Sequence, residues 1–197
     1  MKIISHRRNT LSELAATPTC YGVEVDIRSY GEKLVIHHDA MQPGDSFEEW
    51  IANYRHGTLI LNVKEEGIEE PILKLLSMHR ITDFFFLDQS FPFLVKWANR
   101  GMHQSAVRVS EYESVDTALS LAGKVEWIWV DCFTKFPLLD HQAKSLSDAG
   151  FKLCLVSPEL QGRDAVAGIL ELREILQSSA IVVDAVCTKR PDLWEKK

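Results

Sequence analysis

Short runs of apolar residues alternate with longer amphipathic stretches along most of the chain. About eight of these runs have the length of a β-strand. They lie at residues 2–5, 22–27, 58–63, 83–88, 105–110, 126–132, 151–157 and 180–188.

The stretches between the runs have the apolar spacing and the end signals of helices. Ser46 precedes two glutamates, as a helix N-terminus prefers, and Gly101 follows an apolar stretch, as a C-cap does. The stretch after the first run, residues 11–19, is barely long enough for a helix. The other predicted helices lie at residues 46–54, 70–80, 90–101, 113–124, 140–150 and 164–177.

A strand followed by a helix, repeated about eight times, is the pattern of a parallel sheet with helical crossovers. The pattern predicts an α/β fold, specifically a compact (β/α)8 TIM barrel with short loops. An open doubly wound sheet is the alternative, but no glycine-rich GxGxxG turn follows any strand. The chain has 197 residues, short for a barrel that typically needs about 250. Since no linker or repeat marks a boundary, residues 1–197 are expected to form a single domain.

Composition and charge exclude several classes of function. The formal net charge is −6, whereas a general nucleic-acid binder carries a basic stripe, so no nucleic-acid partner is expected. No apolar run approaches the ~20 residues that span a bilayer, and the apolar stretch near the N-terminus is shorter than a signal peptide is expected to have. We therefore expect a cytosolic protein without a membrane span. Three of its four cysteines lie in apolar runs, where reduced cysteine acts as a small hydrophobe.

Polar residues interrupt two of the predicted strands on one face only. Because side chains alternate along a strand, Glu24 and Asp26 share a face in GVEVDI, and Asn62 and Lys64 share a face in LILNVK. In a barrel this face points inward, and the strand ends near the active site. The pattern therefore predicts a polar cluster at the carboxyl ends of these strands.

Two neighbouring carboxylates repel each other unless a cation or a shared proton lies between them. Glu24 and Asp26 are oxygen ligands of the kind that Mg²⁺ or Ca²⁺ prefers. The alternatives are structural ion pairs with Arg28 or Lys33, or a strand with one face in solvent.

Two histidines end strand-like runs in the same region. His6 follows KIIS, and His38 ends LVIHH, which comes after the Glu24–Asp26 strand across a short turn. Histidines beside a metal can serve as general acid and general base. Each histidine taken alone is also compatible with a structural or surface role.

These residues, in this order, resemble the fingerprint of the glycerophosphodiester phosphodiesterase family, within the phosphatidylinositol-phospholipase-C-like barrels. The fingerprint is a strand ending in His-Arg, a Glu-x-Asp strand preceded by Gly, and a strand ending in His-Asp. Asn9 and Thr10 also resemble part of the family's Glu-Asn-Thr segment. The fingerprint positions are occupied here by His6, Arg7, Gly22, Glu24, Asp26, His38 and Asp39.

The resemblance implies a metal-dependent phosphodiesterase on a (β/α)8 barrel. By position, Glu24 and Asp26 bind Mg²⁺ or Ca²⁺, and His6 and His38 form the acid/base pair. Arg7 contacts the phosphate of a small-molecule phosphodiester. The implied substrate is a glycerophosphodiester or a related sugar or lipid head-group diester.

The family's third-strand motif is Glu-x-Lys, and this chain departs from it. Lys64 matches the lysine that touches phosphate, but Asn62 stands where the glutamate completes the metal site. An amide oxygen can ligate Mg²⁺ or Ca²⁺ with one negative charge fewer. Three consequences are open. The metal is bound more loosely, the metal site is completed by another residue such as Asp88, or the chain has lost activity.

Further candidates lie at other strand ends. Arg108 is a candidate phosphate contact or a surface ion pair. Asp131 is a candidate to orient a substrate hydroxyl or a basic side chain, and Glu159 lies where a loop could reach the mouth of the barrel. Trp127 and Trp129 are expected in the core.

Three functions remain open. The first is the metal-dependent hydrolase. The second is a non-catalytic relative that binds a phosphorylated ligand or a partner protein. The third is a metal-independent activity in which Arg7 and Lys64 replace the cation, which the two carboxylates disfavour.

Overall fold

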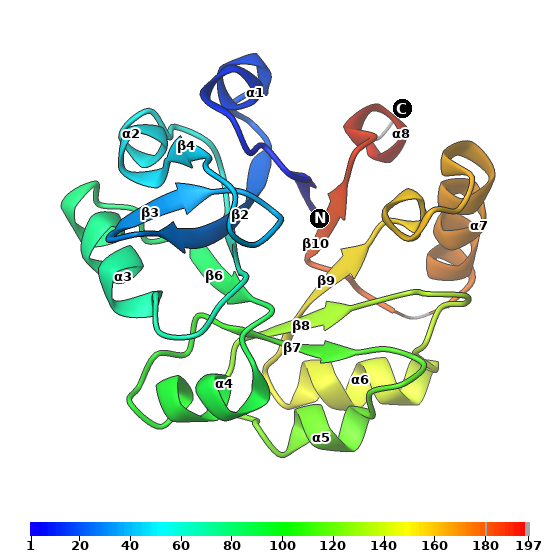
Figure 1. The fold of residues 1–197 in the computed structure, drawn as a ribbon. Coiled ribbons are helices and arrows are strands. Elements are labelled where there is room, and N and C mark those ends of the chain that lie inside the picture. The colour runs from blue at the N-terminus through cyan, green and yellow to red at the C-terminus, as the bar shows by residue number, and fades with distance from the viewer. Residues whose placement is uncertain (180, 196–197) are drawn as a thin grey trace. The chain divides into compact units, whose positions relative to one another are not determined.

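The computed structural model describes residues 1–179 and 181–195 and divides into two compact units (Figure 1). The N-terminal unit is Ser5–Lys96. The C-terminal unit joins Met1–Ile4 to Trp97–Lys197. The boundary between them falls inside helix α4 (Phe91–Ala98).

The N-terminal unit is built on a mixed sheet in the strand order β4-β3-β2-β5-β6. Its central strands β2, β5 and β6 are parallel, while β3 pairs antiparallel with the C-terminal part of β2, from Ile27 to Tyr30, and β4 pairs antiparallel with β3 (Figure 1). The elements are β2 (Gly22–Tyr30), β3 (Lys33–Ile36), β4 (Asp45–Ser46), β5 (Leu59–Val63), β6 (Phe84–Leu87), α1 (Leu11–Ala16), α2 (Phe47–Ala52) and α3 (Glu69–Met78).

The register of β2 against β5 decides where the polar residues meet. Val23, Val25 and Ile27 are fully buried and share one face of β2. On the other face, Asp26 lies directly opposite Asn62 of β5. The apolar face of each strand therefore packs in the core, and the polar side chains on the other faces of the two neighbouring strands come together.

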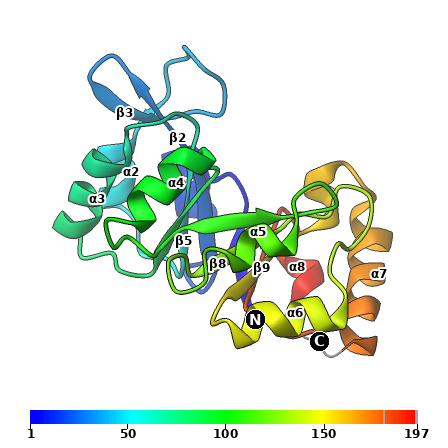
Figure 2. The same ribbon diagram turned by 90° about the horizontal axis from the view of Figure 1, so that it is seen from below.

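The C-terminal unit carries strands in the order β1-β10-β9-β8-β7, and β7 to β10 run parallel. Helices follow each of these strands in the chain (Figure 2). The elements are β1 (Lys2–Ser5), β7 (Ala106–Val109), α5 (Val115–Leu119), β8 (Trp127–Val130), α6 (Asp140–Asp148), β9 (Lys152–Val156), the 3-10 helix η1 (Pro158–Gln161), α7 (Ala165–Ser178), β10 (Ala185–Thr188) and α8 (Pro191–Trp194).

Side-chain caps explain where several helices begin. Thr10 accepts a hydrogen bond from the Glu13 amide, and the Glu13 carboxylate accepts one from the Thr10 amide, which makes a capping box. Ser46, Ser114 and Asp164 cap α2, α5 and α7, and each side chain accepts a hydrogen bond from the amide three residues further on. These polar residues mark where each of the four helices begins.

The strand and helix predictions are largely confirmed. Each predicted run contains a strand, and each predicted stretch contains a helix, including the short α1 at residues 11–16. The strand over 22–27 extends to Tyr30 because it pairs with β3 beyond the turn. The run predicted at 180–188 forms a strand only from Ala185, and residue 180 lies outside the described residues.

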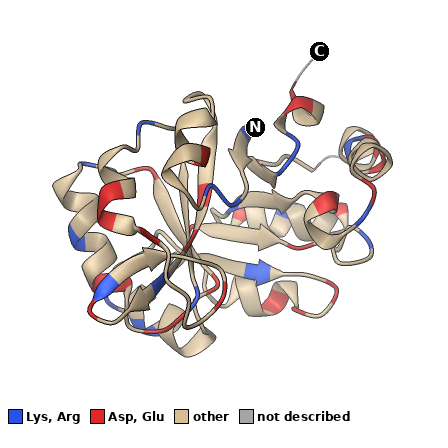
Figure 3. Cartoon of the chain, turned by 45° about the horizontal axis from the view of Figure 1, so that its top comes forward, with Lys and Arg blue, Asp and Glu red and all other residues tan. Residues whose placement is uncertain are grey.

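Several composition-based expectations can be compared with the structure. Cys132, Cys154 and Cys187 are buried thiols, as expected of reduced cysteines in apolar runs. Acidic and basic residues both occur along each unit (Figure 3). Each helix in residues 1–179 and 181–195 is too short or too polar to cross a lipid bilayer. A single domain and a cytosolic location stay predictions.

Candidate functional site

The polar cluster of the N-terminal unit is centred on two carboxylates of β2. Glu24 and Asp26 have no exposed surface at all. An unpaired charge in such a place is costly, so each carboxylate must be compensated. The alternative in which this strand exposes one face to solvent is therefore wrong.

Glu24 is surrounded by hydrogen-bond donors. Its Oε1 accepts from Asn62 Nδ2 at 2.8 Å, and its Oε2 accepts from the backbone amide of Arg7 at 2.7 Å. His6 Nε2 lies 3.7 Å from the same Oε2. Two separate segments, residues 6–7 and strand β5, thus converge on one carboxylate.

Asp26 is compensated by two cations and one amide. Arg7 Nε lies 3.3 Å from Oδ2, and Lys64 Nζ lies 3.2 Å from Oδ1. Asn9 clamps Asp26 from both sides, because its Nδ2 donates to Oδ2 at 2.8 Å and its Oδ1 accepts from the Asp26 amide at 3.0 Å. The cluster therefore concentrates positive charge around a buried carboxylate.

Ion pairs do form here, but with other partners than the sequence suggested. Asp26 pairs with Arg7 and Lys64, whereas the structural alternative named Arg28 and Lys33. Lys33 lies on β3 and is exposed, and Arg28 donates to backbone carbonyls instead. The sequence could not reveal these partners, because the pairing depends on segments far apart along the chain.

Burial dominates the protonation of Glu24. Desolvation and then the neighbouring charge of Asp26 raise the pKa of Glu24 from 4.5 to about 7, although Asn62, the Arg7 amide and Lys64 oppose the rise. A carboxyl with a pKa near neutrality exchanges its proton readily at physiological pH. Strongly perturbed groups of this kind concentrate at functional sites.

Two residues beside the cluster have a left-handed backbone. Arg7 has φ 50°, and Asp88, which lies 3.4 Å from Lys64 Nζ, has φ 59°. Non-glycine residues adopt this conformation at an energetic cost. At Arg7 the conformation coexists with an amide that donates to Glu24 and a guanidinium next to Asp26.

His38 lies in the segment just after β3. Its side chain is 45% exposed, and its Nδ1 lies 2.8 Å from Asp39 Oδ1. The His37 ring instead accepts a hydrogen bond from the Asp39 amide at 2.9 Å. The structure therefore brings His6 into contact with the buried carboxylates, while the His38 ring pairs with its neighbour at the exposed edge.

The loop that returns from His38 to β4 approaches β3 closely. A Cβ atom at Gly44 would lie 2.1 Å from the carbonyl oxygen of Ile36. Real Cβ atoms do not come so near a backbone oxygen, so this position requires glycine as the chain is folded.

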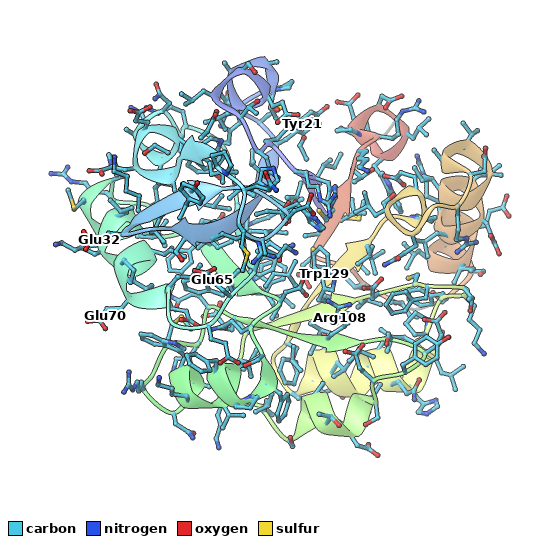
Figure 4. All side chains as sticks on the ribbon, in the orientation of Figure 1. Tyr21, Glu32, Glu65, Glu70, Arg108 and Trp129 are labelled. Atoms are coloured by element: carbon cyan, nitrogen blue, oxygen red, sulfur yellow. The ribbon has the colours of Figure 1, made fainter. Side chains whose placement is uncertain are left out.

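Arg108, the predicted phosphate contact on β7, belongs to the C-terminal unit. Its Nη1 donates to Asp131 Oδ2 at 3.0 Å, and its Nε lies 3.8 Å from Glu113. Arg108 and Trp129 are neighbours across β7 and β8 (Figure 4). Trp129 is buried, as is Trp127. The expectation that both tryptophans lie in the core is confirmed, while a substrate role for Arg108 stays a prediction.

The other two strand-end candidates have protein partners. Asp131 also accepts from Gln161 Nε2 at 2.5 Å. Glu159 accepts from Thr188 Oγ1 at 2.6 Å and from the Lys189 amide at 2.9 Å. Both carboxylates therefore tie neighbouring segments of the C-terminal unit together.

A further carboxylate of this unit, Glu111, occupies a nest of backbone amides. Its oxygens accept from the amides of Phe133, Thr134 and Lys135 at 3.2, 2.7 and 2.8 Å, and from Thr134 Oγ1 at 2.9 Å. Although partial desolvation opposes the effect, these hydrogen bonds lower the pKa of Glu111 to about 2.

The oxygen atoms of the N-terminal cluster are of the kind that holds a hard divalent cation. Among the described residues, none donates a hydrogen bond to the buried Asn62 Oδ1, and Asp26 Oδ1 lies 3.2 Å from Lys64 Nζ. Together with Glu24 they offer two carboxylates and one amide, which suits Mg²⁺ or Ca²⁺. Within the described residues, no three His, Cys, Asp or Glu side chains are placed to hold a metal ion together, so a third protein ligand would have to be of another type, such as the amide oxygen of Asn62.

Sequence reasoning missed two contributors to this cluster. Asn9 was noted only as part of a motif, yet it clamps Asp26. Arg28 was noted only as an ion-pair partner, yet it binds the carbonyls of His38 and Lys64. Arg28 had a detectable signal, because strand alternation places it on the same face as Glu24 and Asp26.

Comparison with solved structures identifies the fold. A glycerophosphodiester phosphodiesterase from Agrobacterium tumefaciens superposes with a TM-score of 0.69 at 14% identity, covering 98% of each chain. The present chain shares the fold of that protein. A putative glycerophosphoryl diester phosphodiesterase from the same organism gives 0.69 at 16% identity, covering 98% of this chain and 94% of the other. One from Parabacteroides distasonis gives 0.65 at 14% identity, covering 96% and 83%.

Sequence comparisons do not extend this likeness. No protein-family model matches the chain, and no curated protein matches it. At these identities the solved structures show the fold, which is mixed α/β and shared with glycerophosphodiester phosphodiesterases. The roles of individual residues therefore depend on the geometry of this chain.

Proposed function

We propose that the protein is a phosphodiester hydrolase whose active site is the polar cluster of the N-terminal unit. The observation that carries the proposal is the fully buried pair Glu24 and Asp26, surrounded by Arg7, Lys64 and His6. The shared fold with glycerophosphodiester phosphodiesterases supports the reaction class. We further propose that the complete fold is a closed (β/α)8 barrel acting on a glycerophosphodiester or a related sugar or lipid head-group diester.

The cations of the cluster suit a phosphate. Arg7 and Lys64 both carry their charge within 3.3 Å of Asp26, and a phosphodiester oxygen would compete for the same donors. Hydrogen bonds from charged donors to phosphate oxygens are among the stronger ones in proteins. These two side chains would hold the phosphate and offset the charge that builds on its oxygens during hydrolysis.

His6 and His38 would divide the proton transfers. One would take the proton of the attacking hydroxyl, from water or from the substrate itself, and the other would give a proton to the leaving alkoxide. His6 already lies against Glu24. His38 sits at an exposed edge, where an entering substrate would meet it.

Glu24, Asp26 and Asn62 would hold a divalent cation, Mg²⁺ or Ca²⁺, which supplies Lewis-acid stabilisation of the phosphoryl oxygens when bound. Asn62 also holds Glu24 through its Nδ2 and leaves its Oδ1 for the cation. With two carboxylates in place of three, binding is expected to be weaker than at a fully anionic site.

The test is hydrolysis of a panel of phosphodiesters, namely a glycerophosphodiester, a sugar phosphodiester and a chromogenic diaryl phosphate. Each is measured with Mg²⁺, with Ca²⁺ and with chelator. The variants are His38→Ala and, as a matched control, His141→Ala on the exposed surface of α6. We expect metal-dependent turnover that His38→Ala abolishes and His141→Ala leaves intact.

The remaining outcomes separate the alternatives. Turnover that survives chelation would favour metal-independent chemistry by Arg7 and Lys64. Phosphate or diester binding without turnover would favour the non-catalytic relative, which the amide at Asn62 supports. Folded protein that binds neither metal nor phosphate would overturn the proposed site.

A further inference from the structure

Arg28 is the third polar residue in the row that Glu24 and Asp26 begin. It lies two residues after Asp26 on β2, so its side chain projects from the same face of the strand. It is half-buried, unlike Ser29 and Tyr30 beyond it, which are exposed. Arg28 therefore stands where the buried row reaches the edge of the sheet.

The guanidinium of Arg28 is held by two carbonyl oxygens from different segments. Its Nε donates to the carbonyl of His38 at 3.0 Å, and its Nη1 donates to the carbonyl of Lys64 at 2.9 Å. Among the described residues, no carboxylate lies within ion-pair distance of it. This arrangement differs from that of Arg7, whose charge faces Asp26.

The two carbonyls belong to segments that follow the ends of strands β3 and β5. His38 comes after β3 has ended, where the backbone no longer follows a ladder. Lys64 comes one residue after β5, and its amide makes the last ladder bond, to Ile27 at 3.1 Å. A planar guanidinium with a fixed fork of donors can join two such carbonyls at a defined separation.

We propose that Arg28 is a positioning residue that fixes the His38 segment relative to Lys64, and both relative to Asp26. The inference rests on the proposed function, in which His38 transfers a proton and Lys64 binds the phosphate of the substrate. Loss of Arg28 would leave both side chains in the protein and allow the backbone that carries them to move. Misplacement of about 1 Å can lower turnover by roughly 10²-fold.

The first experiment measures anchoring without reference to activity. Amide hydrogen exchange is followed by NMR in wild type, Arg28→Met and Arg28→Lys. The reporters are the amides of Asp39, bonded to His37 Nδ1, and Ser29, bonded to Glu65 Oε1. We expect exchange at least tenfold faster in Arg28→Met. Arg28→Lys should be intermediate, because an ammonium lacks the two-pronged geometry.

Lys33→Met is the matched control. It removes one positive charge from the exposed part of the same β2–β3 hairpin. Its exchange rates and turnover should match wild type within a factor of two or so. Thermal unfolding of each variant tests for loss of the fold, and Arg28→Lys supplies the reading if Arg28→Met does not fold.

The second experiment separates positioning from substrate binding. With the diester hydrolysed best by wild type, we expect Arg28→Met to lower kcat by roughly 10²-fold while KM changes less than about threefold. A tenfold rise in KM, or in the Kd for inorganic phosphate, with kcat unchanged would overturn positioning and make Arg28 a phosphate ligand.

The two proposals fail in different ways. Unchanged exchange at Asp39 and Ser29 in Arg28→Met would overturn the anchoring, even in an active enzyme. Wild-type protein without turnover on any diester would overturn the proposed function. Tenfold faster exchange in Arg28→Met would still support the anchoring of the two segments in that case.

Discussion

Glu24 in the N-terminal unit and Glu111 in the C-terminal unit are carboxylates with opposite surroundings. Glu24 is fully buried beside a second carboxylate, and its pKa is raised to about 7. Glu111 accepts three backbone amides and a hydroxyl, and its pKa is lowered to about 2. The ionised form of Glu111 is thus stabilised by hydrogen bonds, whereas the ionised form of Glu24 is destabilised by burial and by the charge of Asp26.

The difference separates a structural role from a functional one. A carboxylate in a nest of amides is stable as it is, and binding a ligand would cost it those bonds. A carboxylate held beside a like charge is stabilised when a cation or a proton binds, because the repulsion between the two charges falls. We therefore look for chemistry at Glu24 and for loop anchoring at Glu111.

The largest expected effect is on turnover. Glu24→Gln and Asp26→Asn should each lower diester hydrolysis by roughly 10²- to 10³-fold, since each removes charge at the reacting centre. Glu111→Gln should retain turnover within about threefold, because its bonds lie within one loop pair. Steady-state kinetics with Mg²⁺ or Ca²⁺ measures all three. Equal losses at Glu24 and Glu111 would erase the distinction.

The next effect is on stability as a function of pH. The folded state holds a proton on Glu24 between its ordinary pKa of 4.5 and about 7, and the unfolded state does not. Stability from this group is therefore present below pH 4.5 and is lost as pH rises through 7, by up to roughly 3 kcal/mol. Urea unfolding without metal from pH 5 to 8 measures the slope. Glu24→Gln should flatten it, and an unchanged slope in that variant would contradict the assignment.

A smaller effect concerns metal affinity. Asn62→Asp adds a carboxylate beside Glu24 and should tighten Mg²⁺ or Ca²⁺ binding roughly tenfold. Asn53→Asp, on the exposed C-cap of α2, is the charge-matched control. Isothermal titration of the folded protein gives both constants. Equal affinity in Asn62→Asp and wild type would remove this residue from the cation site.

The smallest expected effect is at Glu111. Glu111→Gln should cost about 1 kcal/mol of unfolding free energy at pH 7, because an amide matches the nest poorly. The folded state binds fewer protons than the unfolded state between about pH 2 and 4.5, so this contribution is present above 4.5 and fades as pH falls toward 2. Urea unfolding at pH 7 and pH 3 tests it. If the difference in unfolding free energy between wild type and Glu111→Gln were larger at pH 3 than at pH 7, the expected direction of the pH dependence would be wrong.

Local pattern predicted the strands and helices well, because apolar period and capping residues are local properties. Strand alternation also predicted that Glu24 and Asp26 share one face of their strand and that Asn62 and Lys64 share one face of theirs. The register that sets Asp26 opposite Asn62 is seen only in the structure. Local pattern failed wherever a partner came from a distant segment. The clamp of Asn9 on Asp26 depends on how the loops fold over the sheet.

The carbonyl contacts of Arg28 and the amide nest of Glu111 escaped prediction for a related reason. Backbone groups carry no residue type, so no sequence motif marks them as partners. The antiparallel β4 was missed as well, because two residues, Asp45 and Ser46, are too few for an alternating pattern. The irregular segments around a site are thus the part that a sequence conceals.

The loop between β3 and β4 has a constrained end, where Gly44 approaches Ile36 closely, and an exposed tip. Any side chain at position 44 would push the loop away from β3, whereas Met41, at the tip, is 91% exposed. New residues inserted around Met41 would therefore leave the closure at Gly44 in place. The tip is the natural place to graft a longer loop and so to redesign which molecules reach His38.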